Sequence, residues 1–110
     1  MGYFGEAVEF EWDEGNAKRN WHRHKVSQQE AEQVFFNTPF LVYYDDLHSD
    51  SEDRSLGFGL TDAGRFLFVV FTLRGELQRV RVISARDMMP SERRRYEHAR
   101  AQAIEGDSDL

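Results

Sequence analysis

The 110-residue chain has no cysteine, only two lysines and no apolar run long enough to cross a membrane. Without cysteine, a disulfide framework and a thiolate zinc site are both excluded. The longest apolar run, Phe66–Phe71, has the length of a strand, whereas a membrane span needs roughly 18 residues. The first residues show neither the basic region nor the apolar stretch of a secretory signal. We therefore expect a cytoplasmic protein that does not contact a membrane.

Apolar and aromatic residues are plentiful. Hydrophobic residues make up 40% of the chain, and the aromatic residues comprise nine Phe, four Tyr and two Trp. A disordered chain has far fewer of both, and a chain of this length buries enough surface to form its own core. We expect a single domain over residues 1–104, followed by an acidic flexible tail over residues 105–110.

Charge is divided unevenly along the chain. The formal net charge is −6, which argues against a protein that coats nucleic acid indiscriminately. Residues 1–55 carry a net charge of −7, but the segment Arg65–Arg95 holds eight arginines and a net charge of +5. Arginine suits bidentate contacts with phosphate or carboxylate, so this segment can provide an anion site. Solvated or carboxylate-paired strand arginines explain the same charge equally well, and both interpretations stay open.

The N-terminal third of the chain predicts one strand and two short helices. Polar and apolar residues alternate over Glu6–Trp12, which indicates a half-buried strand. Asp13 is placed to cap a helix through Asn16–His24. Ser27 and Glu30 have the spacing of a capping box, so a second helix is expected to begin there.

Strand-like segments dominate the rest of the chain, and the turn residues between them indicate successive hairpins. The predicted strands are Phe40–Tyr44, Arg54–Leu60, Arg65–Arg74 and Leu77–Arg86. Arg65–Arg74 lacks a polar face and is expected in the centre of the sheet. Pro90 fits the first turn of a final helix over Ser91–Ile104. The predicted fold class is α+β: a single twisted antiparallel β-sheet with two N-terminal helices on one face, a C-terminal helix, and the other face free to carry a site.

Most motifs for cofactors, metals and nucleophiles are missing. The four histidines lack metal-ligand spacing, and the acidic loop Asp45–Asp53 fits no calcium-loop pattern. No phosphate-loop, dinucleotide or nucleophile-elbow motif occurs, so we expect no metal and no cofactor. A site of histidine and arginine remains. His24, between Arg23 and Lys25, is the best candidate for proton transfer near neutral pH, although a helix C-cap explains it as well.

Several blocks of residues, all in the right order, resemble the BrnT toxin family. The most specific are the start Glu11–Asp13 and the block Ile83–Arg86. The matching positions are Phe10–Asp13, Asn20, Arg23–Ser27, Glu30, Ala31, Val34, Phe35, Glu52, Arg54, Gly57, Gly64, Arg65, Val69–Thr72, Arg74, Val82–Arg86, Glu92, Arg93 and Tyr96.

The resemblance implies a type II toxin–antitoxin toxin with a fold like the RelE toxins. Such a toxin is a small endoribonuclease that cleaves RNA and inhibits translation. Its expected partner is a ribbon-helix-helix antitoxin, BrnA, which neutralises it. The complex represses its own promoter, and the antitoxin makes the DNA contacts, so the toxin would meet DNA only indirectly.

The resemblance also suggests a metal-independent mechanism in which the ribose 2′-hydroxyl attacks the adjacent phosphate. His24 would move a proton, with Glu52 either the base or the partner that aligns an arginine. Positively charged side chains would stabilise the extra charge of the transition state. The expected phosphate ligands are Arg54, Arg74 and Arg86. Further RNA contacts are expected from Arg23, Lys25, Arg65, Arg79 and Arg81.

The chain departs from the family pattern at two places. The family usually reads Lys-His-Gly where this chain has Arg23, His24 and Lys25. The family often has a lysine at the position of Asn16. An alternative function of a different class is a catalytically inactive module of the same fold, which binds a partner protein through its exposed sheet.

Overall fold

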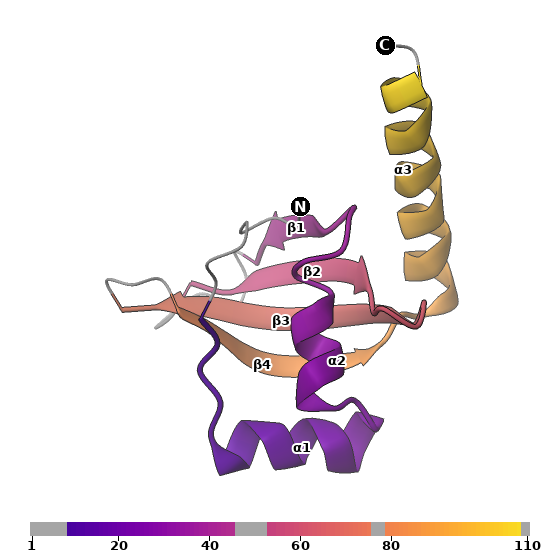
Figure 1. Ribbon diagram of the computed structural model, residues 1–110. Coiled ribbons are helices and arrows are strands. Elements are labelled where there is room, and N and C mark those ends of the chain that lie inside the picture. The colour runs from indigo at the N-terminus through magenta and orange to yellow at the C-terminus, as the bar shows by residue number, and fades with distance from the viewer. Residues whose placement is uncertain (1–8, 46–52, 76–78, 109–110) are drawn as a thin grey trace.

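A computed structural model describes residues 9–45, 53–75 and 79–108 of the chain. Its elements are α1 (Glu14–His24), α2 (Gln28–Gln33), β1 (Leu41–Tyr44), β2 (Ser55–Leu60), β3 (Phe66–Arg74), β4 (Arg79–Asp87) and α3 (Pro90–Ser108). The four strands form one antiparallel sheet in the order β1-β2-β3-β4, and α2 lies across one of its faces (Figure 1). The α+β prediction is confirmed, and β3 lies between two strands as expected.

The core lies between the sheet and the chain around α2. Side chains alternate along a strand, and the buried members of β3 are Leu67, Val69 and Phe71. Val34 and Phe35, which directly follow α2, are also fully buried and pack in the same cluster. The rings of Phe35 and Phe71 meet edge to face with their centroids 5.0 Å apart. One face of the sheet is therefore covered, and we call the other the open face.

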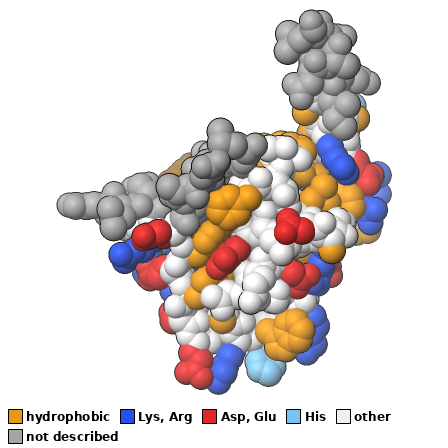
Figure 2. All heavy atoms as spheres, in the orientation of Figure 1, with side chains coloured by type: hydrophobic (Ala, Val, Ile, Leu, Met, Phe, Trp, Pro, Cys, Tyr) orange, Lys and Arg blue, Asp and Glu red, His pale blue; other side chains and the backbone are white. Residues whose placement is uncertain are grey.

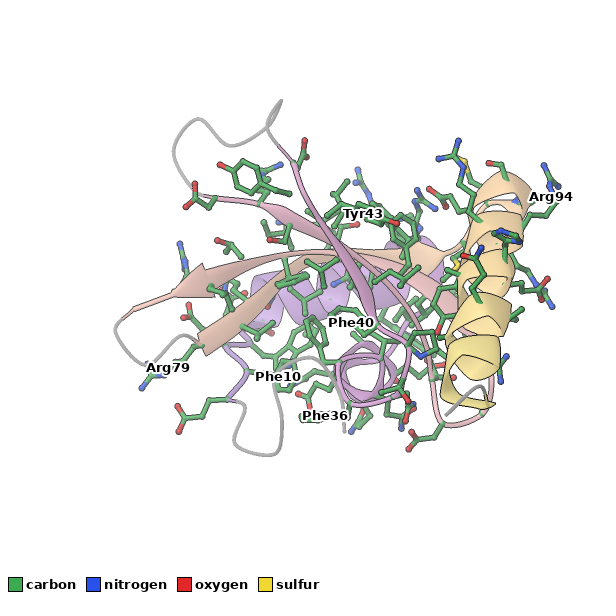
Figure 3. The ribbon with its side chains drawn as sticks, turned by 90° about the horizontal axis from the view of Figure 1, so that it is seen from above. Phe10, Phe36, Phe40, Tyr43, Arg79 and Arg94 are labelled. Carbon is green, nitrogen blue, oxygen red and sulfur yellow. The ribbon has the colours of Figure 1, made fainter. Side chains whose placement is uncertain are left out.

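Gly57 in β2 is required by the close approach of Phe40. A Cβ atom at this position would lie 2.5 Å from Cζ of Phe40, which is far inside contact distance. Glycine therefore leaves room for the Phe40 ring within the core. This ring lies with Phe10 and Phe36 on the α2 side of the sheet (Figure 3).

Both N-terminal helices begin at capping boxes, where the sequence predicted a cap at Asp13 and a capping box at Ser27. At α1 the Asp13 carboxylate accepts the Asn16 backbone N–H at 2.9 Å, while the Asn16 side chain accepts the Asp13 N–H at 2.8 Å. At α2 the same reciprocal bonds join Ser27 and Glu30, each at 3.1 Å. These bonds satisfy donors that the first turn of a helix leaves unpaired.

The segment before α1 forms less regular strand structure than predicted. Residues 6–8 of the expected strand lie outside the described residues, and in the rest only Phe10 forms a bridge, parallel to Val80 of β4. The Val80 N–H donates to the Glu9 carbonyl at 2.9 Å, and its carbonyl accepts from the Glu11 N–H at 2.8 Å. The predicted alternation still holds, because Phe10 packs against the core. The capping box at Asp13 turns the chain into α1 and ends the pairing.

The outer edge of β4 is completed by two asparagines of α1. The amide nitrogen of Asn16 donates to the Val82 carbonyl at 3.0 Å, and the Asn20 side-chain oxygen accepts the Ala85 N–H at 3.1 Å. Both asparagines are buried. Unpaired groups on an edge strand otherwise invite pairing with another chain, so α1 protects this edge. The same bonds fix α1 alongside β4.

A β-bulge changes the side-chain alternation within β4. Val70 pairs with Ser84, but the next residue, Phe71, pairs with Val82, so Ile83 is the extra residue. The bulge shifts the alternation by one residue. Arg86 therefore points to the open face, as Arg79 and Arg81 do, although seven and five positions separate it from them.

α3 is attached to the rest of the protein by its first turns and then projects away from the sheet (Figure 1). Tyr96 is buried, and its hydroxyl donates to the Pro39 carbonyl. The helix runs to Ser108 rather than ending at Ile104, so residues 105–108 of the predicted flexible tail are helical. Alanine and glutamine in the preceding turn favour this continuation. Within the described ranges, no helix is long and apolar enough to span a membrane.

We expect Asn20→Ala to lower the free energy of unfolding by about 1–3 kcal/mol, because it leaves the buried Ala85 N–H without its acceptor. Urea denaturation measures this change. The control is Arg19→Ala, an exposed neighbour on the same helix, which should change stability by less than about 0.5 kcal/mol. Equal stability of the two variants would contradict the role of Asn20.

Candidate functional site

Three arginines are paired with carboxylates at the end of the open face where β3 ends and β4 begins. Their partners are every second residue of the segment that leads into α1. The pairs are Arg74–Glu11 at 3.1 Å, Arg79–Glu9 at 3.2 Å and Arg81–Asp13 at 2.8 Å. A hydrogen bond from the Asn16 backbone and one from Arg81 hold the pKa of Asp13 below its ordinary value. At this end of the sheet, the carboxylate-paired interpretation of the arginine segment is therefore the one observed.

Arg65 holds the end of α1 against the sheet. Its guanidinium binds Asp87 at 2.7 Å and Glu30 at 3.1 Å, and also donates to the carbonyls of His24 and Lys25. All three guanidinium nitrogens are engaged, and the side chain is only 26% exposed. Arg65, which we expected to contact RNA, is thus occupied in bracing α1, α2 and β4 together.

The Arg65 contacts place His24 beside a carboxylate. His24 is half-buried at the end of α1. The hydrogen bond from Arg65 lowers the pKa of Asp87 most, and the charge of His24 lowers it further. Asp87 is therefore ionised at neutral pH, and His24 lies close enough to act on it. A histidine next to a carboxylate can accept and return a proton during a reaction.

Arg86 lies on the open face, next to Asp87 in the chain. Its guanidinium makes a two-pronged contact with Glu92, at 2.8 and 3.0 Å, and lies 4.2 Å from the centroid of the Phe68 ring. Hydrogen bonds from Arg86 and from the Met89 N–H hold the pKa of Glu92 below its ordinary value, against the effect of its burial. Arg86 is thus held in one orientation at the end of β4.

Exposed cations surround the end of α1. Arg23 and Lys25 are exposed and have no ion-pair partner within the described ranges. The Lys25 ammonium lies 5.5 Å from the centroid of the Trp21 ring, which is half-exposed. Figure 2 shows basic, histidine and hydrophobic side chains together at this end of α1. These cations are available to an anionic ligand.

Lys25 stands in a backbone conformation that favours glycine. It is the C-cap of α1, with φ 55° and ψ 39° in the left-handed region. Glycine adopts this conformation without the clash that a β-carbon brings. The glycine that the BrnT pattern has at this position is thereby explained.

The structure does not bring all the predicted site residues together. Arg74 lies six residues along β3 from Phe68, the partner of Arg86, which is about 20 Å of strand. Arg54 precedes β2 and lies near the Arg74 end of the sheet, since Ser55 pairs with Phe71. Glu52 lies outside the described residues. The described open-face arginines are therefore split between two ends of the sheet, and Arg86 is the one at the end of β4 where Asp87 lies.

Sequence reasoning missed three acidic residues that shape this region: Glu30, Asp87 and Glu92. Glu92 follows Arg86 by six residues across a helix start, a spacing without a sequence signature. Asp87 and Glu30 meet only through Arg65, which is 22 and 35 residues away in the chain. Among the described residues, no three histidine or acidic side chains come together as a metal site would require.

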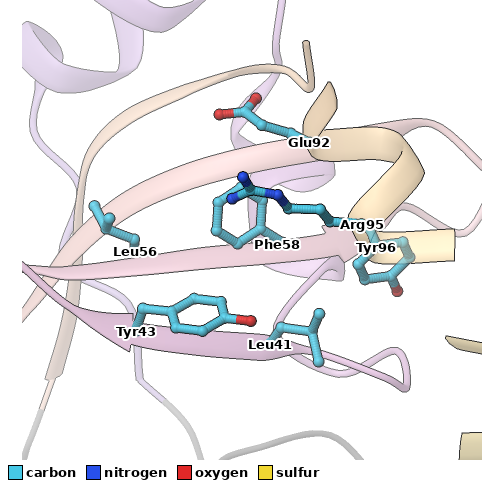
Figure 4. A pocket seen from close by; sticks show the side chains of 7 residues that line it. All are labelled: Leu41, Tyr43, Leu56, Phe58, Glu92, Arg95 and Tyr96. Carbon is cyan, nitrogen blue, oxygen red and sulfur yellow. The ribbon is translucent and has the colours of Figure 1, made fainter. Parts of the chain in front are cut away.

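A pocket of about 310 Å³ opens beside this region, between the open face and α3 (Figure 4). The sheet contributes Leu41, Tyr43, Leu56 and Phe58. The first turns of α3 contribute Glu92, Arg95 and Tyr96. The walls are thus mostly apolar and aromatic, with charged groups on the α3 side.

A small α+β protein that places a histidine, carboxylates and arginines together has the groups for cleaving a phosphodiester. The family model described as the ribonuclease toxin BrnT of type II toxin–antitoxin systems matches residues 12–92. The chain therefore belongs to the BrnT family of ribonuclease toxins, and the resemblance found in the sequence is confirmed. Membership implies an RNA substrate and an antitoxin partner. No match was found among curated proteins.

We expect the free energy of unfolding to fall as the pH drops below about 4.5, the ordinary pKa of Glu30. Burial opposes its ionisation, but hydrogen bonds from the Ser27 backbone and Arg65 outweigh burial and lower its pKa. Asp87 and Glu92 shift the same way. A group with a lowered folded pKa contributes stability above its unfolded pKa and loses it as the pH falls through the folded value.

Arg65→Gln tests this brace directly. We expect about 1–2 kcal/mol lower stability at pH 7, and a smaller loss between pH 7 and pH 3 than in the wild type, because two of the shifted carboxyls lose their partner. Denaturation at several pH values measures both effects. Arg94→Gln, which removes an exposed arginine of α3 without an ion pair, is the control and should follow the wild type. An unchanged pH dependence in Arg65→Gln would be evidence against the brace.

Lys25→Gly should raise the free energy of unfolding by about 1 kcal/mol, because it relieves the left-handed strain at the C-cap. Lys18→Gly, in the interior of the same helix, should instead lower it by about 1 kcal/mol. Thermal denaturation of the two variants gives the signs. A loss of stability in both would show that the Lys25 side chain contributes more than its backbone costs.

Proposed function

We propose that the chain is a metal-independent endoribonuclease that cleaves RNA where β4 ends, and that it inhibits translation by this cleavage. One observation carries the proposal: Arg86 and Asp87 are consecutive residues, and Asp87 interacts with His24. A guanidinium suited to bind phosphate and a histidine suited to transfer a proton therefore lie at the same end of β4. The cations beside His24, which have no ion-pair partner among the described residues, support an anionic substrate at this end.

In the proposed reaction the ribose 2′-hydroxyl attacks the adjacent phosphorus. The new P–O2′ bond forms as the bond to the 5′ oxygen of the next nucleotide breaks, which leaves a 2′,3′-cyclic phosphate and a 5′-hydroxyl. His24 takes up or delivers one of the two protons, and Asp87 stabilises its charged form. Arg86 binds the phosphate oxygens and stabilises the charge that grows on them, with Glu92 as its positioning residue.

The other residues predicted from the sequence have flanking, positioning or outer roles in this proposal. Arg23 and Lys25 contact phosphates that flank the cleaved bond, and Arg65 acts as a positioning residue through the backbone of His24. The arginines that bind N-terminal carboxylates act at most as outer contacts: Arg74, Arg79 and Arg81. Roles for Arg54 and Glu52 stay predictions from the resemblance.

The proposal extends to the partner. We infer that the antitoxin is a ribbon-helix-helix protein of the BrnA kind, that the complex meets DNA through the antitoxin, and that the pair acts in the cytoplasm. Family membership supports an antitoxin partner and a ribonuclease activity, whereas the type of antitoxin and the arrest of translation stay predictions from the resemblance.

His24→Ala should lower kcat/KM for RNA cleavage at least about 100-fold, the usual loss on removal of a proton-transfer group. Cleavage of a short oligoribonucleotide by the purified protein, in the presence of EDTA, measures this. The products should carry 2′,3′-cyclic phosphate ends, and growth arrest in cells should be lost in the same variant.

His22→Ala is the matched control, since His22 is an exposed histidine two residues away on the same helix. It should cleave at close to the wild-type rate. Wild-type activity in folded His24→Ala would refute the assignment of His24. A wild-type protein that binds its antitoxin but cleaves no RNA would instead favour the inactive interaction module.

A further inference from the structure

Apart from Glu92, which positions Arg86, the pocket between the open face and α3 takes no part in the cleavage chemistry described above. Its floor is apolar and aromatic, and Phe58 continues a row of rings across the open face: Tyr43 lies 5.9 Å from Phe58, and Phe58 lies 4.9 Å from Phe68. Tyr43 is 56% exposed, which is high for an aromatic side chain at a pocket rim. Such a surface stacks well against a planar ring.

Size argues for a small occupant. At about 310 Å³ the pocket lies at the lower end of the range of ligand pockets, which take roughly 300–1,000 Å³. A single ring system fits this space, whereas a helix of a partner protein does not. RNA-binding proteins use exposed aromatic side chains in this way, stacking unpaired bases upon them.

The Arg95 guanidinium forms no ion pair or hydrogen bond within the described ranges. It reaches from α3 toward the pocket (Figure 4), and its charge acts on Glu92 there. Glu92, by contrast, has both carboxylate oxygens bound to Arg86. Among the described residues, the pocket therefore offers the hydrogen-bond donors of Arg95 and no unpaired carboxylate. Such a lining suits a ligand that presents two hydrogen-bond acceptors side by side.

The pocket also adjoins the proposed phosphate ligand. Glu92 lines the pocket and holds Arg86, so the base site and the phosphate site share a wall. Because Glu92 contacts Arg86 and lines the same pocket as Arg95, we infer that a nucleotide with its 3′-phosphate at Arg86 would direct its base into the pocket. Guanine presents two acceptors, O6 and N7, on one edge, and arginine binds them as a pair, whereas adenine presents a donor beside N7.

We propose that this pocket binds the guanine base on the 5′ side of the cleaved bond and makes the enzyme guanine-selective. The proposal rests on the proposed ribonuclease function. Arg95 selects the base through its two acceptors, and Tyr43 with Phe58 supplies the stacking surface.

The chain offers a matched neighbour for each test residue. Arg94 is also an exposed arginine of α3 without an ion pair among the described residues, but it lies on the side of the helix away from the sheet (Figure 3). Tyr44 follows Tyr43 in β1 and is equally exposed, but it points to the opposite face and its hydroxyl donates to Asp53. Arg94→Ala and Tyr44→Ala are thus controls of the same residue type.

The experiment compares four oligoribonucleotides that differ only in the base 5′ of one cleavable bond. We expect the wild type to prefer guanine by about tenfold or more in kcat/KM, and Arg95→Ala to lose this preference. Tyr43→Ala should raise KM about tenfold for all four oligoribonucleotides, whereas Tyr43→Phe should keep the wild-type KM. Both controls should behave as the wild type.

A second measurement does not depend on catalysis. Calorimetric titration with guanosine 3′-monophosphate should show binding that is weaker for the adenosine, cytidine and uridine 3′-monophosphates and weakened about tenfold by Arg95→Ala. If the wild type binds guanosine 3′-monophosphate selectively but cleaves no RNA, the guanine site is supported and the cleavage proposal is contradicted.

Three results would overturn the inference. The first is equal cleavage of the four oligonucleotides together with equal binding of the four nucleotides. The second is a guanine preference that survives Arg95→Ala. The third is wild-type cleavage by the Arg95 and Tyr43 variants combined with loss of neutralisation by the antitoxin, which would assign the pocket to the partner protein.

Discussion

The outer edge of β4 is the constraint on which the rest of the structure depends. An edge strand leaves alternate backbone groups unpaired, and here the chain's own N-terminal segment and α1 pair with them. The two asparagines that do so are buried, so α1 has one allowed position along the strand. Because His24 ends that helix, its place beside Asp87 follows from the hydrogen bonds that the two asparagines make about one and two turns earlier.

The distribution of charge explains how an acidic protein can act on RNA. The carboxylates of the segment before α1 neutralise the arginines at one end of the open face. Cations without such partners gather instead at the end of α1 and along α3, on either side of the end of β4. An overall net charge of −6 therefore coexists with a local positive region, which suits the recognition of a few phosphates rather than broad binding.

Local patterns were enough to predict the elements. The cap at Asp13, the capping box at Ser27 and the apolar run of β3 each depend on neighbours in the chain, and all appear as expected. The face of Arg86 was not predictable in this way. Alternation alone would have placed it with Val80 and Val82 in the core, and the bulge at Ile83 moves it to the open face. A bulge arises from how two strands pair, which neither strand encodes by itself.

The candidate site could likewise be predicted only in part from the sequence. The sequence by itself determined the fold class and the family, and it predicted histidine and arginine as the reactive groups, because composition, periodicity and motif order are properties of the chain. Only the tertiary structure decided which carboxylate each arginine binds. Arg86 pairs with Glu92 six residues further on, whereas the carboxylate partners of Arg65 and Arg81 lie tens of residues away along the chain. Pairing of charges depends on distance in space, and folding alone sets that distance.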